Sequence, residues 1–131
     1  QINYSKNKKK YTFRGLHYQT GRSAEDKLVV CVRGKIQDIF VNIQKDSKEY
    51  LKSSSEILDC KENKVLLVPR GFAHGFLTLK ENTEVIYFST NFYDPGKEKG
   101  IRWNDPRIKL VLKSKPRIIS EKDKNINFLD S

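Results

Sequence analysis

Short runs of strand-forming residues, separated by turn-forming residues, fill most of this 131-residue chain and restrict the folds open to it. In the run 27–33, even-numbered residues fall on one face and odd-numbered residues on the other, as the two-residue period of a β-strand requires. We expect further strands at residues 11–19, 36–43, 50–58, 65–69, 73–79 and 84–90. Many short strands with frequent turns are typical of an all-β sandwich or barrel.

The length of the chain predicts one domain, residues 1–131, with a real hydrophobic core. Residues 104–131 are richer in Pro, Asn and Lys, so we expect one short helix, or a strand near residues 108–112, and otherwise an irregular segment that wraps the surface. The chain starts at Gln1 and contains no Met, which leads us to expect that a native N-terminal segment is missing.

Composition narrows the class of protein. No apolar run approaches the ~20 residues that cross a bilayer, and no signal peptide is visible, so we expect no membrane association. Cys31 and Cys60 form no CxxC pattern, which favours a reducing cytoplasm. The formal charge is +10, but the lysines are spread along the whole chain. Scattered lysines favour a small anionic ligand, such as a nucleotide diphosphate, over nucleic acid.

The only two histidines lie in two distinctive strand segments. His17 lies in Arg14-Gly15-Leu16-His17-Tyr18-Gln19, and His74 lies in Pro69-Arg70-Gly71-Phe72-Ala73-His74-Gly75-Phe76. Histidine has the side chain whose unperturbed pKa is nearest neutrality, so an imidazole on a rigid strand can take up a proton and release it again. These segments are therefore the first candidates for a catalytic site.

Pro69-x-Gly71-x-x-His74 has the spacing of the second cupin motif, and Gly34 lies where the first cupin motif ends. The chain thus resembles a cupin, which implies a double-stranded β-helix, or jelly-roll, barrel. Metal-binding cupins carry His-x-His in the first motif, whereas His17 is followed by Tyr18 and Gln19. Two lone histidines without a matching carboxylate make a poor metal site, so we expect no metal.

Taken together, these motifs resemble the dTDP-4-dehydrorhamnose 3,5-epimerase family. The matching runs follow the family's order at residues 1–5, 14–19, 27–34, 36–43, 69–76, 87–95, 100–106 and 120–123. The resemblance implies an enzyme without a cofactor, usually a homodimer, that acts on a nucleotide-diphosphate sugar. Its implied reaction inverts C3 and C5 of dTDP-4-dehydro-6-deoxy-D-glucose and gives dTDP-4-dehydro-L-rhamnose. A proton next to a ketone is weakly acidic, so such chemistry needs a base, an enolate stabiliser and an acid on the opposite face.

The resemblance assigns the catalytic roles. His17 is the implied general base, and Asp123 is its implied dyad partner, although from the sequence alone Asp123 reads as a solvated carboxylate near the chain end. Lys27 would stabilise the enolate oxygen, and it shares a strand face with other residues that we expect to point into the barrel. Tyr87 would be the general acid, because a phenol with a pKa of about 10 stays protonated at neutral pH. Tyr93 is the rival acid; we prefer Tyr87 because it is in the middle of a strand.

The remaining implied residues bind substrate. Arg14 and His74 match residues that contact the diphosphate, and Asp38 could orient His74. Arg14 and His17 differ in strand parity, so both can serve one site only if Gly15 permits a bulge or a twist. The resemblance places Gln1, Asn3, Tyr93 and Lys122 near the nucleotide or the sugar. Gln1, as the first residue, could instead be frayed.

Three alternatives stay open at this stage. A relative that inverts only one carbon would use the same base, so the sequence does not separate the two enzymes. A catalytically silent cupin that binds sugar nucleotides would retain the pocket without the proton transfer. A basic nucleic-acid binder would require clustered cations and exposed aromatic residues on one face, which the scattered lysines do not favour. Departures from the family, such as Asn42-Ile43-Gln44, lie in a region that is more structural than catalytic.

Overall fold

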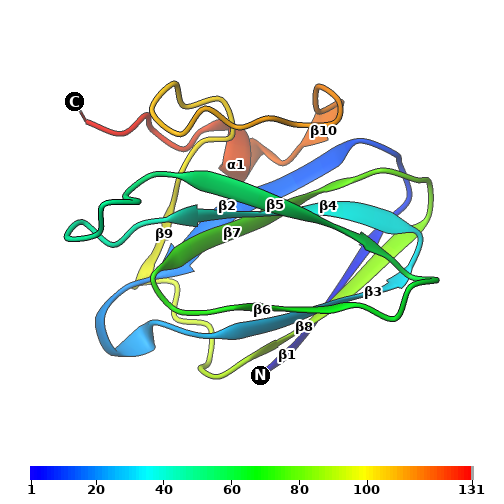
Figure 1. The fold of residues 1–131 in the computed structure, drawn as a ribbon, viewed down its shortest axis with the longest axis horizontal. Helices are drawn as coiled ribbons and strands as arrows, with labels where there is room; N and C mark the ends of the chain where they lie inside the picture. Colours follow the sequence, from blue (N-terminus) through cyan, green and yellow to red (C-terminus); the bar gives the residue numbers. More distant parts are fainter. Residues whose placement is uncertain (131) are drawn as a thin grey trace.

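The computed structural model describes residues 1–130 as two β-sheets that pack face to face (Figure 1). One sheet has four strands in the order β1-β8-β3-β6, and the other has the order β10-β2-β7-β4-β5 with β9 paired to β2. A short helix, α1, lies near the C-terminus. The strands and helices are β1 (Ile2–Asn7), β2 (Thr12–Gln19), η1 (Gly21–Ser23), β3 (Lys27–Arg33), β4 (Lys35–Asn42), β5 (Ser53–Asp59), β6 (Val65–Val68), β7 (Phe72–Thr78), β8 (Thr83–Ser89), β9 (Glu98–Gly100), β10 (Ile118–Ile119) and α1 (Glu121–Lys124).

Two apolar clusters hold the layers together. The first fills the space between the two sheets and includes the buried side chains of Val29, Phe76 and Val85. The second lies on the outer face of the larger sheet and includes Phe13 and Leu77, which pack against side chains of the C-terminal segment such as Ile101. Burying a side chain of this kind contributes about 1.5–3 kcal/mol. The C-terminal segment is therefore the third layer of the molecule, as the orange and red chain above the larger sheet shows (Figure 1).

The predicted all-β fold is confirmed, and so are most of its strands. The strand predicted at 27–33 has the observed bounds of β3, and those predicted at 11–19, 36–43, 65–69, 73–79 and 84–90 differ from β2, β4, β6, β7 and β8 by at most one residue at either end. The face assignments also hold, since Lys27 is buried toward the interior with Val29 while Leu28 is exposed.

The strand predicted at 50–58 began too early. Residues 47–51 form successive turns, and Leu51 has a positive φ of 65°, so the extended backbone of β5 begins only at Ser53. Of the two alternatives for residues 104–131, the short helix is present as α1, and the strand near 108–112 was wrong because those residues are irregular. Apolar residues at 108, 110 and 112 pack on the larger sheet without any ladder of their own.

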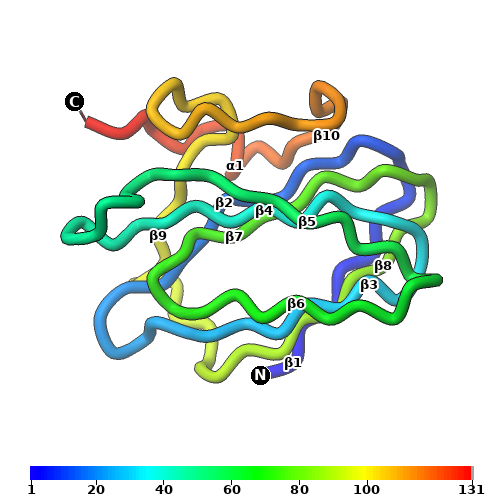
Figure 2. The backbone as a smooth tube through the Cα atoms, viewed as in Figure 1, coloured from blue at the N-terminus to red at the C-terminus, as the bar shows by residue number. Residues whose placement is uncertain are grey.

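The sequence pattern missed three strands, β1, β9 and β10. β1 pairs with the edge of β8 from Ile2↔Phe88 to Asn7↔Thr83, so it is stabilised by a partner that is distant in sequence. Its position puts the N-terminus at the smaller sheet, on the side of the molecule opposite the C-terminus (Figure 2). Within residues 1–130, no helix is long and apolar enough to span a bilayer.

Candidate active site

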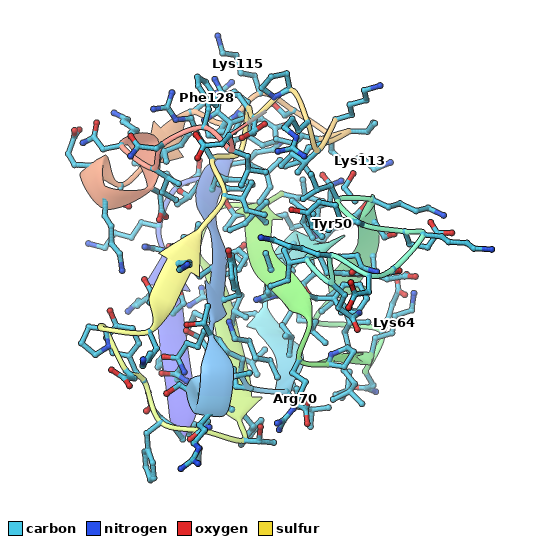
Figure 3. All side chains as sticks on the ribbon, turned by 90° about the vertical axis from the view of Figure 1, so that its left-hand side faces the viewer. Tyr50, Lys64, Arg70, Lys113, Lys115 and Phe128 are labelled. Atoms are coloured by element: carbon cyan, nitrogen blue, oxygen red, sulfur yellow. The ribbon has the colours of Figure 1, made fainter. Side chains whose placement is uncertain are left out.

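A hollow of about 300 Å³ lies where β2 ends and β3 begins. Figure 3 views the molecule from this side, on which β9 and the loop with η1 lie in Figure 1. The hollow is lined from both sheets, from β9 and from α1. Seven of the residues predicted from the sequence line it: Gln1, Asn3, His17, Lys27, Tyr87, Tyr93 and Lys122.

His17 and Asp123 form a close pair at this hollow. The Nε2–H of His17 donates to Asp123 Oδ1 at 2.6 Å, which leaves Nδ1 as the nitrogen that can accept a proton. The histidine side chain is 30% exposed, whereas that of Asp123 is 5% exposed. Burial raises the pKa of Asp123, but the hydrogen bond and charge of His17, together with hydrogen bonds to Gly15 and Ser120, hold that pKa below its usual value. Asp123 is therefore the anionic partner that supports an imidazolium when it forms.

The chain places this pair through two local features. Ser120 caps α1 by accepting a hydrogen bond from the backbone of Asp123 at 3.1 Å, which turns the Asp123 carboxylate toward β2. There, the N–H of Gly15 donates to Asp123 Oδ2 at 3.1 Å. Gly15 has φ +122° and lies within a register shift between Arg14 and His17 on β2. The bulge or twist at Gly15, which we predicted from the different strand parity of Arg14 and His17, is therefore present.

Lys27 approaches the hollow from the start of β3. Lys27 as a whole is only 8% exposed, and its ammonium lies 3.4 Å from a carboxylate oxygen of Glu25. The same ammonium lies 5.5 Å from the ring centroid of Tyr87. A cation held in a partly dry hollow is suited to stabilise an oxyanion that develops beside it.

Tyr87 enters the hollow from β8. Burial raises the pKa of its phenol, and the carboxylates of Glu25 and Glu98 raise it further against the opposing charges of Arg14 and Lys122. The phenol is therefore protonated at neutral pH and can donate a proton. Tyr93 is 51% exposed and lies in the loop that follows β8, so its ring is held less firmly.

Gln1, Asn3 and Lys122 form the outer wall of the hollow. Gln1 is not frayed, because its ammonium donates to the carbonyl of Ser89 at 2.8 Å and its side-chain oxygen accepts from the N–H of Tyr93 at 2.8 Å. Its side-chain amide also donates to Asn3 at 2.7 Å. The Lys122 ammonium lies 5.9 Å from the centroid of the Tyr93 ring. A polar or anionic ligand in the hollow would meet these polar groups.

Arg14 and His74 do not line this hollow. Arg14 is exposed and donates through Nε to Asn7 at 2.6 Å. His74 is 5% exposed, and it is hydrogen-bonded at 2.7 Å to Asp38, which is fully buried. The His74 ring lies edge-on to that of Tyr87, with centroids 6.4 Å apart. The expected contact between Asp38 and His74 is thus present, and His74 lies behind the hollow rather than on its surface.

Four residues that line the hollow were not identified from the sequence: Tyr18, Gln19, Glu25 and Glu98. Glu25 lies in a loop and Glu98 begins a strand of three residues, so no periodicity indicated where either side chain points. Each carboxylate is paired with a lysine of the hollow, Glu25 with Lys27 and Glu98 with Lys122. Within residues 1–130, no three His, Cys, Asp or Glu side chains cluster as a metal site requires.

The arrangement is suited to proton transfer at carbon. One hollow holds a histidine with a free ring nitrogen, a buried ammonium and a protonated phenol. These are the groups that remove a proton beside a carbonyl, stabilise the resulting enolate and return a proton.

Sequence comparisons match this chain to one family over its whole length. The family model described as dTDP-4-dehydrorhamnose 3,5-epimerase matches residues 1–131. The enzyme of that name from Escherichia coli K12 is 40% identical over 131 residues, which cover 99% of this chain and 70% of the relative. The Salmonella typhimurium enzyme is 44% identical over 108 residues, 82% of this chain, and the chain spans only 58% of that relative's length.

Solved structures share the fold. The dTDP-4-dehydrorhamnose 3,5-epimerase of Bacillus anthracis, with TDP and PPi bound, has a TM-score of 0.95 and 36% identity, and the match covers 98% of this chain and 74% of that one. The dTDP-6-deoxy-D-glucose-3,5-epimerase of Legionella pneumophila, in complex with dTDP-4-keto-L-rhamnose, has a TM-score of 0.92 and 30% identity, and the match covers 98% and 68%.

Proposed function

Because this chain belongs to the dTDP-4-dehydrorhamnose 3,5-epimerase family, we propose that it catalyses that family's reaction. The substrate is dTDP-4-dehydro-6-deoxy-D-glucose, and inversion at C3 and C5 gives dTDP-4-dehydro-L-rhamnose. The observation that carries the proposal is the meeting of His17, Lys27 and Tyr87 at one hollow, with Asp123 behind His17. No redox step is needed, because each inversion only removes and returns a proton.

In this mechanism, Nδ1 of His17 takes the proton from the carbon next to the 4-keto group, and Asp123 stabilises the imidazolium that forms. The ammonium of Lys27 stabilises the enolate oxygen. The phenol of Tyr87 then protonates the carbon from the opposite face, which inverts the centre. Solvent returns a proton to Tyr87 and accepts one from His17 before the second carbon reacts.

The nucleotide part of the substrate is anionic and aromatic, and the outer wall of the hollow suits it. Gln1, Asn3 and Tyr93 offer amide groups and a ring, and Lys122 offers a cation. We also assign Arg14 to the diphosphate. The sequence suggested His74 for the same contact, but His74 lies behind the hollow against Asp38 and the edge of Tyr87, so we assign it to the support of Tyr87 instead. Arg14 is exposed, and its guanidinium could bind a phosphate bidentately in exchange for the contact with Asn7. The bound TDP of the Bacillus anthracis structure supports a nucleotide ligand of this kind.

Solvent-exchange NMR tests the proposed function. The purified protein is incubated with dTDP-4-keto-6-deoxyglucose in heavy water, and we expect deuterium at both C3 and C5 together with the L-rhamno product. Deuterium at a single carbon would instead identify a single-carbon epimerase. Tight binding of the nucleotide sugar without any exchange would show a non-catalytic sugar-nucleotide-binding protein and would refute the proposed activity.

We further propose that the protein works as a homodimer, through the outer face of the smaller sheet. Two apolar rows cross this face in register: Ile2, Phe88, Leu28 and Leu67, and beside them Tyr4, Ile86, Val30 and Val65. Exposed fractions in these rows range up to 69%, at Ile2. A contiguous apolar face on a sheet is typical of an interface, and a second copy offers the same face through a two-fold axis.

The free thiols Cys31 and Cys60 suit a reducing compartment, so we place the dimer in the cytoplasm.

The dimer is tested with Leu28→Lys, which puts a charge into the middle of the apolar rows. We expect the variant to weaken the dimer by about 100-fold, as loss of a central apolar contact typically does. Sedimentation equilibrium measures the effect. The control is Val111→Lys, because Val111 is 85% exposed on the C-terminal segment, away from the smaller sheet. A wild-type monomer, or equal dimerisation of both variants, would show that this face is not the interface.

A further inference from the structure

Glu25 is the unexpected group of the hollow, because a carboxylate opposes the binding of an anionic nucleotide sugar. It lies in the loop between η1 and β3, and its side chain is only 12% exposed. A surface carboxylate could turn away into water, but this one lines the same hollow as Lys27 and Tyr87. Its position therefore calls for a role that outweighs its repulsion of the ligand.

The contacts of Glu25 fix its carboxylate from three strands. One oxygen faces the ammonium of Lys27, on β3, at 3.4 Å. The other accepts hydrogen bonds from the hydroxyl of Ser89, on β8, and from the side-chain amide of Gln19, on β2, at 3.5 Å. Gln19 is itself anchored, because its amide donates to the carbonyl of Ser23 at 2.8 Å and its oxygen accepts from the N–H of Asp94 at 2.7 Å. The carboxylate is thus part of a connected network rather than a solvated charge.

This network acts on Lys27 and Tyr87, which both line the hollow. With the Lys27 ammonium 5.5 Å from the centre of the Tyr87 ring, an unbalanced cation there would favour the phenolate. A phenolate cannot donate a proton, so a carboxylate that balances this cation widens the pH range over which Tyr87 can act as the acid. The charged and titratable groups around Tyr87 are Glu25, Glu98, Arg14, Lys122, Lys27 and His74. Among the carboxylates, Glu25 contributes more than Glu98 to keeping the phenol protonated.

We propose that Glu25 is a positioning residue, which holds the Lys27 ammonium at the hollow and balances its charge beside the Tyr87 phenol. This inference rests on the proposed epimerase function for its kinetic consequence. Its electrostatic consequence does not depend on that function, because it concerns only the ionisation of Tyr87. The two parts can therefore be tested separately.

The first test is the ionisation of Tyr87 in Glu25→Gln, which keeps the shape of the side chain and an acceptor for Ser89 but removes the charge. Tyrosine labelled with carbon-13 is titrated by NMR, and Tyr87→Phe identifies the resonance. We expect the Tyr87 midpoint to move to lower pH, because a negative charge that opposes the phenolate is gone. An unchanged midpoint would overturn the proposal, whether or not the protein is an epimerase.

The second test is kinetic. In Glu25→Gln, we expect kcat for exchange into the sugar to fall by roughly five- to tenfold, the effect of about 1 kcal/mol in the transition state. KM should stay the same or decrease, because the variant removes a negative charge from the site of an anionic substrate. A merely structural role would raise KM and lower the unfolding midpoint, with no selective loss of kcat, and that result would contradict the inference.

A matched control removes another carboxylate that faces a lysine. Glu62 lies 3.3 Å from Lys64 in an exposed pair beyond β5, and Lys64 is at the far edge of the molecule in Figure 3. We expect Glu62→Gln to leave the Tyr87 midpoint, kcat and KM unchanged. If the wild-type protein showed no exchange, the proposed function would fail, and the Tyr87 titration would still decide the role of Glu25.

Discussion

Replacement of His17 with alanine is expected to lower kcat by roughly 10²–10⁴-fold, the usual contribution of a general base. The reason is geometric, since His17 is the group at the hollow with a free ring nitrogen and a buried anionic partner. Steady-state kinetics in heavy water would measure the loss as a lower rate of deuterium entry into the sugar.

Controls for His17→Ala separate chemistry from folding. The substitution removes the hydrogen bond to the buried carboxylate of Asp123, so the free energy of unfolding should fall by about 1–3 kcal/mol, which leaves the protein folded. Binding of dTDP should also persist, because the nucleotide is assigned to other residues. A variant that folds, binds dTDP and retains full exchange activity would remove His17 from the mechanism.

Gly15→Ala is expected to destabilise the protein by about 3 kcal/mol or more, because the new side chain meets backbone that cannot rotate away. A Cβ at this position would lie 2.7 Å from the Cα of Gly75 and 2.9 Å from the carbonyl oxygen of His74. The φ of +122° is also strained for any L residue. Chemical denaturation followed by circular dichroism measures the loss. Because Gly15 donates to Asp123, activity should fall with stability.

Gly21→Ala is the matched control. Gly21 also has a positive φ, +59°, but a Cβ there would meet no atom within 4 Å. Its cost should therefore be limited to the left-handed backbone, about 1–2 kcal/mol. Equal destabilisation by the two substitutions would show that the close approach of β2 and β7 does not constrain Gly15.

The sequence predicted the fold where the alternating pattern was strong. β3 was found with its bounds because a two-residue period is visible within a single strand, and the same period placed Lys27 toward the interior. β1 was missed because most of its residues are polar, and pairing with β8 is what stabilises it. The start of β5 was misplaced because Leu51 lies in a turn with a positive φ. Leucine is not a typical turn residue, so the sequence did not indicate this turn.

The candidate site was predictable only in part. The motif around His17 marked the base, but its contact with Asp123 joins residues 106 positions apart, and no local pattern reports such a contact. The resemblance to the family supplied Asp123, and the structure places it against His17. Neither the local sequence pattern nor the family resemblance identified Glu25, because its role depends on contacts between a loop side chain and three strands.

The central claim is that His17 and Tyr87 act on one sugar ring from opposite faces. A crystal structure of the protein with a bound dTDP-4-keto-6-deoxy sugar tests it most directly. We expect the ring to lie in the hollow, with Nδ1 of His17 and the hydroxyl of Tyr87 on opposite faces at about 3–3.5 Å, and with the keto oxygen toward Lys27. A sugar ring bound outside the hollow, or one with both groups on the same face, would rule out this mechanism.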